Sequence, residues 1–204
     1  MNERSAAPLA IVASSDKAGI EELGKALHEM EWRIVGTGGT VARLQDCGVP
    51  AETVDALIEM PELFGGRVKT LHQDIFAGLL YRRGNAQDEG EVSKRSIASI
   101  DLVACTFYSM PAESEARVAP DDLPDHIDIG GPAMVRAAAK SHRWVLPLVD
   151  PADYEPVATT IRRHGGRPDA IGIEERRRLA AKAFRGTAAY DKAIADRLSA
   201  PPPA

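Results

Sequence analysis

The stretch from Leu9 to Thr40 decides the fold class, and it reads LAIVASSDKAGIEELGKALHEMEWRIVGTGGT. Its apolar run at 9–13 predicts a short buried strand, which a polar turn and a helix over 20–30 follow. A second strand at 33–36 leads into a glycine-rich turn and another helix. This repeated order of strand, turn and helix predicts an α/β fold with a mainly parallel sheet.

The rest of the chain continues this pattern. Further strands are expected at 49–54, 101–108 and 144–149, and further helices at 73–83, 132–140, 154–164 and 174–198. The polar stretch 85–94 is expected to be a surface loop or a frayed helix. Because the sequence has no internal repeat and no separating linker, we expect one domain over 1–198, followed by a stiff proline-rich tail at 199–204.

The composition excludes several classes of protein. Of 204 residues, 44% are hydrophobic, which is enough for a buried core at this length. A net charge of −5 and an aromatic content of 5% argue against a nucleic-acid-binding protein. Two cysteines, Cys47 and Cys105, cannot form a disulfide framework, so reduced thiols in a cytoplasmic protein are expected. No signal-peptide core and no membrane-length apolar run is evident, so a membrane is not an expected partner.

Ligand-binding residues are expected directly after the strands, because open parallel sheets bind ligands at the carboxyl ends of their strands. The turn Ser14–Lys17 offers hydroxyls, N–H groups and an ammonium to a phosphate; an ordinary helix cap with a surface lysine is the alternative. The turn Gly36–Thr40 has glycines that allow close approach and N–H groups that can surround an anion; a plain strand-to-helix turn is the alternative. Two such turns after neighbouring strands strengthen the phosphate interpretation of both.

A third segment, 65–72, reads GGRVKTLH. In an extended backbone Arg67 and Lys69 would share one side, where two cations could bind a phosphate or polarise a carbonyl. A solvated basic loop is the alternative. His72 alone is a weak signal, because it could be a packing residue.

The fourth segment, 127–140, reads IDIGGPAMVRAAAK and is the strongest candidate. Asp128 stands between two isoleucines, and a carboxylate in apolar surroundings can bind its proton more tightly, which suits a general acid or base. Pro132 fits the first helical position, and Gly130 and Gly131 open the helix and expose its N–H groups. Arg136 and Lys140, four residues apart, lie on one face of that helix. A capping aspartate and a solvated helix face are the alternative.

Two residues of the strand expected at 101–108 allow separate interpretations. Tyr108 at its end could donate a hydrogen bond into a pocket, or it could be a half-buried strand-end tyrosine. Cys105 in mid-strand is interpreted as a core residue rather than a nucleophile, because no activating group is near it in the sequence. Without HExxH, CxxC or a spaced His/Asp set, no metal site is expected.

Taken in order, these segments resemble the inosine monophosphate (IMP) cyclohydrolase domain of the bifunctional purine-biosynthesis family. The matching strings, between residues 9 and 196, are SSDKAGI, GTGGT, GRVKTLH, DLVAC-x-x-Y, IDIGGPAMVRAAAK and LAAKAFRGTAAYD. The resemblance implies a three-layer α/β/α fold similar to methylglyoxal synthase. It implies dehydrative closure of the purine six-membered ring on a nucleotide substrate, without a metal or cofactor. It also implies a homodimer and, since the formyltransferase half is absent from this sequence, a separate formyltransferase partner.

The resemblance assigns roles to residues of both turns and both motifs. The implied catalytic residues are Lys69, Tyr108, Asp128 and Lys140. The implied substrate-binding residues are Ser15, Asp16, Lys17, Thr37, Gly38, Gly39, Thr40, Arg67, Val68, Thr70, Cys105, Thr106, Ile129 and Gly130. In this assignment Asp128 takes a proton from the attacking amide, Lys69 and Lys140 stabilise the departing oxygen, and the tyrosine orients the carbonyl.

The sequence also departs from the family pattern. Ala13 and Ser14 replace a Ser-Val pair, Gln73 replaces a proline, and Ser-Met at 109–110 replaces Pro-Phe. Thr106 replaces an asparagine, and a hydroxyl is shorter and less directional than a planar amide. Two alternatives therefore stand beside IMP formation: a paralogue that closes a related ring in a specialised purine-like nucleoside pathway, and a non-catalytic nucleotide-sensing domain. The retained acid–base residues argue against the sensor.

Overall fold

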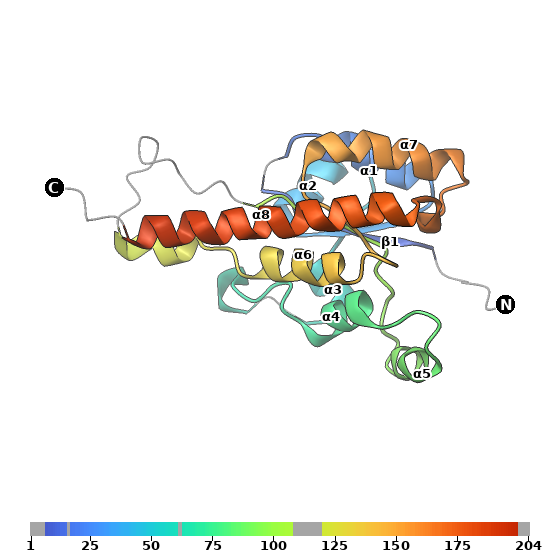
Figure 1. Cartoon of the computed structure of the whole chain (residues 1–204), viewed down its shortest axis with the longest axis horizontal. Coiled ribbons are helices and arrows are strands. Elements are labelled where there is room, and N and C mark those ends of the chain that lie inside the picture. The colour runs from blue at the N-terminus through green and yellow to red at the C-terminus, as the bar shows by residue number, and fades with distance from the viewer. Residues whose placement is uncertain (1–6, 16, 61–62, 108–119, 200–204) are drawn as a thin grey trace.

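Five parallel strands form the centre of the molecule (Figure 1). The structure is a computed structural model that describes residues 7–15, 17–60, 63–107 and 120–199. The strands are β1 (Leu9–Val12), β2 (Arg33–Gly36), β3 (Glu52–Thr53), β4 (Leu102–Ala104) and β5 (Leu146–Leu148), in the spatial order β3-β2-β1-β4-β5. Every pairing between neighbouring strands is parallel. The predicted parallel α/β fold is confirmed.

Helices cover both faces of this sheet and make the three layers (Figure 1). One face carries α1 (Ile20–Glu29), α2 (Gly38–Asp46) and α7 (Tyr154–Arg163), and the other carries α3 (Val54–Ile58), α4 (Gln73–Leu80) and α6 (Gly130–Lys140). The long helix α8 (Ile173–Ser199) packs against α6 and β5, and α5 (Ala86–Lys94) lies at the periphery. Short 3₁₀ turns span Phe64–Gly66, Pro120–His126, Pro151–Asp153 and Pro168–Ala170.

Some predicted elements differ in length or type from the observed ones. The expected strand at 49–54 shrinks to two residues, because β3 is an edge strand that pairs with β2 only at Glu52 and Thr53. The stretch 85–94 is a helix, α5, which Asn85 caps by accepting the Asp88 N–H at 3.1 Å. No residue of α5 is buried, so its sequence carries no apolar periodicity to reveal it.

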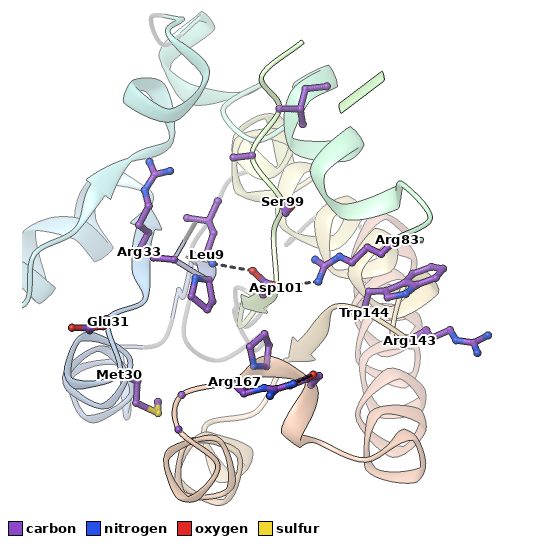
Figure 2. A pocket seen from close by; sticks show the side chains of 18 of the residues that line it. Leu9, Met30, Glu31, Arg33, Arg83, Ser99, Asp101, Arg143, Trp144 and Arg167 are labelled. Atoms are coloured by element: carbon purple, nitrogen blue, oxygen red, sulfur yellow. Dashed lines mark hydrogen bonds and ion pairs between the residues drawn. The ribbon is translucent and has the colours of Figure 1, made fainter. Parts of the chain in front are cut away.

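Buried charges fix the amino ends of the central strands (Figure 2). Asp101 accepts hydrogen bonds from the Leu9 N–H at 3.0 Å and from the Arg83 guanidinium at 2.7 Å. A cavity of about 1090 Å³ opens at this edge, and Arg176 in its wall donates to the Ile171 carbonyl at 2.8 Å. These guanidinium groups satisfy buried acceptors of the protein itself, so we assign this edge a structural role.

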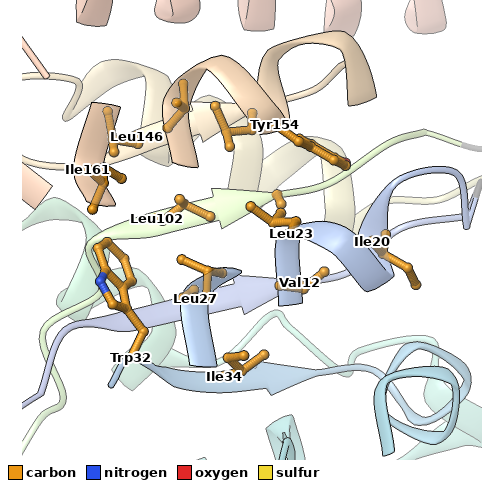
Figure 3. Packing of buried hydrophobic residues seen from close by; sticks show 14 of the residues in the cluster. Val12, Ile20, Leu23, Leu27, Trp32, Ile34, Leu102, Leu146, Tyr154 and Ile161 are labelled. Carbon is orange, nitrogen blue, oxygen red and sulfur yellow. The ribbon is translucent and has the colours of Figure 1, made fainter. Parts of the chain in front are cut away.

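Two apolar clusters hold the layers together, one on each face of the sheet. On one face Leu23 and Leu27 of α1 pack over Val12 and Leu102, and Ile161 of α7 completes the cluster (Figure 3). Each fully buried aliphatic side chain of this kind contributes about 1.5–3 kcal/mol. The core therefore fixes the strand ends on which the polar turns stand.

The order of the strands creates a switch point between β1 and β4. The chain leaves β1 through α1 on one face, and it leaves β4 toward β5 through α6 on the opposite face. The connections that follow β1 and β4 therefore lead to opposite faces of the sheet, although the two strands remain paired. Open α/β sheets bind their ligands in the crevice that such a reversal leaves.

Candidate active site

A cleft of about 270 Å³ opens at this switch point. Predicted site residues line it, namely Ser15, Lys17, Thr37, Gly39, Arg67, Lys69, Thr70, Thr106, Asp128 and Gly130. Ala13, Ser14, Gly66 and Gly131, which were not among the predicted set, line it as well. Segments that follow three neighbouring strands thus meet in one space, together with the segment 66–70.

One end of the cleft is suited to an anion. The Lys17 ammonium donates to Thr40 Oγ1 at 2.9 Å and to the carbonyl of Ser14, and burial lowers the pKa of Lys17. Helix α2 begins at Gly38 after the extended cap residue Thr37, so its first N–H groups lack intrahelical acceptors. The space beside Gly38 and Gly39 is open. An ammonium and a helix N-terminus together favour a phosphate group here.

The two serines after β1 tie that strand end to the end of β4. Ser15 Oγ donates to the Phe107 carbonyl at 2.6 Å and to the Thr106 carbonyl at 3.1 Å. The hydroxyls of Ser14 and Thr106 lie 2.5 Å apart and share a hydrogen bond. These contacts fix the width of the cleft, and they give Ser15 a structural role in addition to its place in the wall.

Asp128 lines the same cleft, two residues before α6 begins. Its Oδ1 accepts the Gly131 N–H at 3.0 Å, so the carboxylate also caps the helix, as the alternative interpretation held. The expected apolar surroundings are only partly present: Ile129 is 58% exposed and does not line the cleft, whereas Cys105 lies beside Gly131. Burial, and then the negative charge of Asp128, raise the pKa of the Cys105 thiol, which fits a core residue and not a nucleophile.

The glycine pair that opens α6 is required by close contacts. A Cβ atom added to Gly131 would overlap Asp128 Oδ2 and would lie 3.2 Å from Cys105 Sγ. A Cβ atom added to Gly130 would overlap Thr70 Oγ1. Only glycines let the start of α6 approach both the acid and the threonine this closely.

The basic segment reaches the cleft through turns and not as an extended strand. Gly65 and Gly66 take positive φ angles of 63° and 89°, and the Lys69 N–H bonds to the Gly66 carbonyl at 3.3 Å. Arg67 forms an ion pair with Asp125 in which both side chains are about two-thirds exposed, at 66% and 64%, so the pair adds little stability. The prediction of an extended backbone at residues 67–69 is therefore wrong, although Arg67 and Lys69 both line the cleft.

Comparison with known proteins identifies the family. The model of the MGS-like domain matches residues 19–133, more than half of the chain. The chain belongs to the MGS-like family. Residues 138–203 of this MGS-like protein match a second model, the AICARFT/IMPCHase bienzyme. Both the family resemblance and the three-layer fold predicted from the motifs are thereby confirmed.

Relatives of known name cover nearly all of the MGS-like chain. It is 45% identical to the bifunctional purine biosynthesis protein PurH of Deinococcus radiodurans and 40% identical to that of Bacillus subtilis, each over 93% of this chain. The chain spans only 35% and 36% of the length of these two relatives. It also matches the crystal structure of ForH with a TM-score of 0.87 and 40% identity, over 94% of this chain and 98% of that one.

One predicted catalytic residue of the MGS-like protein lies elsewhere. Lys140 is exposed at the last residue of α6, roughly 15 Å along the axis from Gly130. It lines a separate groove with Leu80 and Phe184. The prediction that Lys140 shares a cleft with Asp128 is therefore wrong within one chain, because the helix that carries it points its far end away from the site.

The remaining predicted residues have varied positions. Gly38, Thr40, Val68, Cys105 and Ile129 do not line the cleft, although Thr40 holds Lys17. Asp16 and Tyr108, like Ser109 and Met110, lie outside the described residues. His72 caps α4 by accepting the Asp74 N–H at 3.2 Å, in agreement with its weak signal.

Within residues 7–15, 17–60, 63–107 and 120–199, no group of three or more His, Cys, Asp or Glu side chains could hold a metal ion. In the same part of the chain, no helix has both the length and the apolar character needed to cross a bilayer.

Proposed function

We propose that the protein is an IMP cyclohydrolase, which closes the six-membered ring of 5-formamidoimidazole-4-carboxamide ribotide with loss of water. One observation carries the proposal: a single cleft is lined both by anion-binding groups, Lys17 and the start of α2, and by the acid–base candidates Asp128 and Lys69. We call these two parts the anion-binding end and the acid–base end. The match to the AICARFT/IMPCHase bienzyme and the PurH relatives support this activity.

At the anion-binding end, the 5′-phosphate of the substrate binds Lys17 and the first N–H groups of α2. Clamping the phosphate orients the two neighbouring amide groups of the imidazole toward Asp128. Ring closure is intramolecular, so correct orientation alone supplies a large part of the rate. Thr70 and Gly130 line the same cleft, and we assign them contacts to the ribose or base.

At the acid–base end, the carboxamide nitrogen attacks the carbon of the formamido group and a C–N bond forms. Asp128 takes the proton that the nitrogen loses. The former carbonyl oxygen carries the developing negative charge beside the Lys69 ammonium. It receives the proton that Asp128 took and becomes a hydroxyl. A second proton, lost by the formamido nitrogen as the C=N bond forms, is transferred to this hydroxyl, so that the C–O bond breaks and water leaves. The products are IMP and one water molecule, and no step calls for an external oxidant or reductant.

Replacing Lys17 with methionine is expected to raise KM for the ribotide about tenfold or more, with a smaller change in kcat, because a charge-assisted contact to phosphate is lost.

Burial lowers the pKa of Lys17, so its ammonium deprotonates at a lower pH than an exposed lysine does. KM of the wild type should therefore rise earlier on the alkaline side than that of Lys17→Arg. Steady-state kinetics across pH measure this, with exposed Lys94→Met as the control; an unchanged KM in Lys17→Met would contradict the phosphate role.

We also propose that the protein is a homodimer that works with a separate formyltransferase in the cytoplasm. The groove that contains Lys140 exposes the apolar side chains of Phe184, at 40%, and Leu80, at 36%. Exposed apolar surface of this kind is typical of protein–protein contacts. In a dimer that packs through this groove, Lys140 of one copy can reach the active-site cleft of the other. Light scattering should give twice the chain mass of 21.9 kDa; a monomer with full activity would exclude both the dimer and the lysine's role.

A second function is favoured by the hydrogen bond between Ser14 and Thr106. The Thr106 hydroxyl is 2.5 Å from Ser14 Oγ, in a position where the family motif has an amide that can recognise a base edge. The base pocket can therefore suit a related heterocycle, so that the chain closes a purine-like ring in a specialised nucleoside pathway. The ForH match covers 98% of that chain, so that chain has nearly the same extent as the matched part of this one.

A steady-state assay of the purified protein against several formylated ribotides tests these functions together. Ring closure on the imidazole carboxamide ribotide, followed by its change in absorbance, supports IMP formation. Faster closure of a different heterocycle supports the specialised pathway. Tight nucleotide binding without turnover of any ribotide would overturn both and favour the sensor.

A further inference from the structure

Tyr190, on the long helix α8, lies next to Asp128 at the acid–base end of the cleft. Its side chain is buried, with the residue only 6% exposed. Its hydroxyl accepts a hydrogen bond from the backbone N–H of Asp128 at 2.8 Å, although the two residues are 62 positions apart. The tyrosine is thus the direct link between α8 and the residue that the proposed mechanism uses as its base.

The same ring also packs on the segment that follows β4, next to a residue of the cleft wall. It stacks on Phe107, with 5.5 Å between ring centroids and 24° between ring planes. Phe107 directly follows Thr106, which lines the cleft, and its carbonyl accepts the Ser15 hydroxyl at 2.6 Å. One aromatic side chain is therefore bonded to the segment before α6 and packed on the segment after β4.

A glycine in α8 makes space for the stacking of Tyr190 on Phe107. Gly186 stands one turn before Tyr190, on the same face of the helix. A Cβ atom added there would lie 3.1 Å from the Phe107 ring, tighter than ordinary packing allows. The helix itself is anchored by Leu179 and Ala183, which are fully buried in the apolar clusters. A rigid support therefore holds the tyrosine in place.

We propose that Tyr190 is a positioning residue for Asp128, an assignment that rests on the proposed ring closure. Its hydroxyl fixes the Asp128 backbone, and this fixes where the carboxylate stands relative to a substrate held at the anion-binding end. Its ring fixes the distance between the two cleft walls. Tyr190 bonds to the backbone of Asp128, the proposed general base, and not to the substrate. Loss of this bond should therefore lower kcat more than it changes KM.

Tyr190→Phe tests the proposal, because it keeps the stacked ring and removes only the hydroxyl. We expect kcat to fall about three- to tenfold, which corresponds to the loss of one hydrogen bond, with KM changed less than about twofold. Tyr81→Phe is the matched control, since it removes the bond between Tyr81 and Ser99 (2.6 Å) at the other edge of the sheet. That control should retain the wild-type kcat.

A second measurement does not depend on activity. Hydrogen exchange at the Asp128 amide should be about three- to tenfold faster in Tyr190→Phe than in the wild type, and unchanged in Tyr81→Phe. If the wild type closes no ring but the exchange result holds, the proposed function fails while the structural link stands. Wild-type kcat and wild-type exchange in Tyr190→Phe would overturn the proposal, as would an equal loss of kcat in both variants.

Discussion

Replacement of Asp128 by asparagine is expected to lower kcat about 10²- to 10⁴-fold, the usual contribution of a positioned general base. Asparagine has the same shape, and its amide oxygen can still accept the Gly131 N–H that Asp128 Oδ1 accepts at 3.0 Å. The backbone bond to Tyr190 is also unaffected. The variant therefore separates proton transfer from helix capping, and the measurement is kcat at saturating ribotide together with the melting temperature.

Asp169→Asn is the matched control for this variant. Asp169 is exposed and pairs with Arg167 at 2.7 Å at the amino edge of the sheet, away from the cleft. It should keep the wild-type kcat and melting temperature. If Asp128→Asn retained more than about a third of the wild-type kcat, the role of Asp128 as the base would be contradicted.

Gly131→Ala is expected to reduce kcat by on the order of 10²-fold while the protein remains folded. The added methyl group overlaps Asp128 Oδ2, which is the free end of a side chain and can move aside, whereas the backbone of α6 is held by its own hydrogen bonds. The carboxylate then leaves its position, so the chemical step suffers and the fold does not. Steady-state kinetics and far-UV circular dichroism measure the two effects.

Gly90→Ala provides the comparison for Gly131→Ala. Gly90 lies inside helix α5, and a Cβ atom there would meet nothing within 4 Å. The substitution should therefore stabilise the protein by about 0.5–1 kcal/mol and leave kcat unchanged. Wild-type kcat in Gly131→Ala would show that the short distance between Gly131 and Asp128 is not required for catalysis.

The layered fold could be predicted because its signals are local. The apolar run at 9–13, the helical spacing that follows it and the polar turn between them each depend on neighbouring residues. Strand lengths could not be predicted in the same way, because β3 pairs with β2 only through Glu52 and Thr53 and this pairing is set by tertiary contacts. Helix α5 was ambiguous because it buries nothing.

Site residues could be predicted where they belong to a local motif or directly follow a strand. They could not be predicted where their role depends on contacts with distant parts of the chain. Lys17 follows from the rule that parallel strands bind ligands at their carboxyl ends, whereas Asp128 is predicted from the motif that surrounds it. The spacing of Arg136 and Lys140 predicts a shared helix face but says nothing of the distance from Asp128 to the far end of α6. The bond between Tyr190 and Asp128 spans 62 residues, so no local pattern reveals it.

A single assay, in which pure wild-type protein is mixed with 5-formamidoimidazole-4-carboxamide ribotide, tests ring closure itself. We expect steady formation of IMP, with loss of one water per ribotide consumed and at least a hundredfold lower rate in Asp128→Asn. A wild-type rate no faster than the uncatalysed background, with the ribotide nevertheless bound in the cleft, would contradict it.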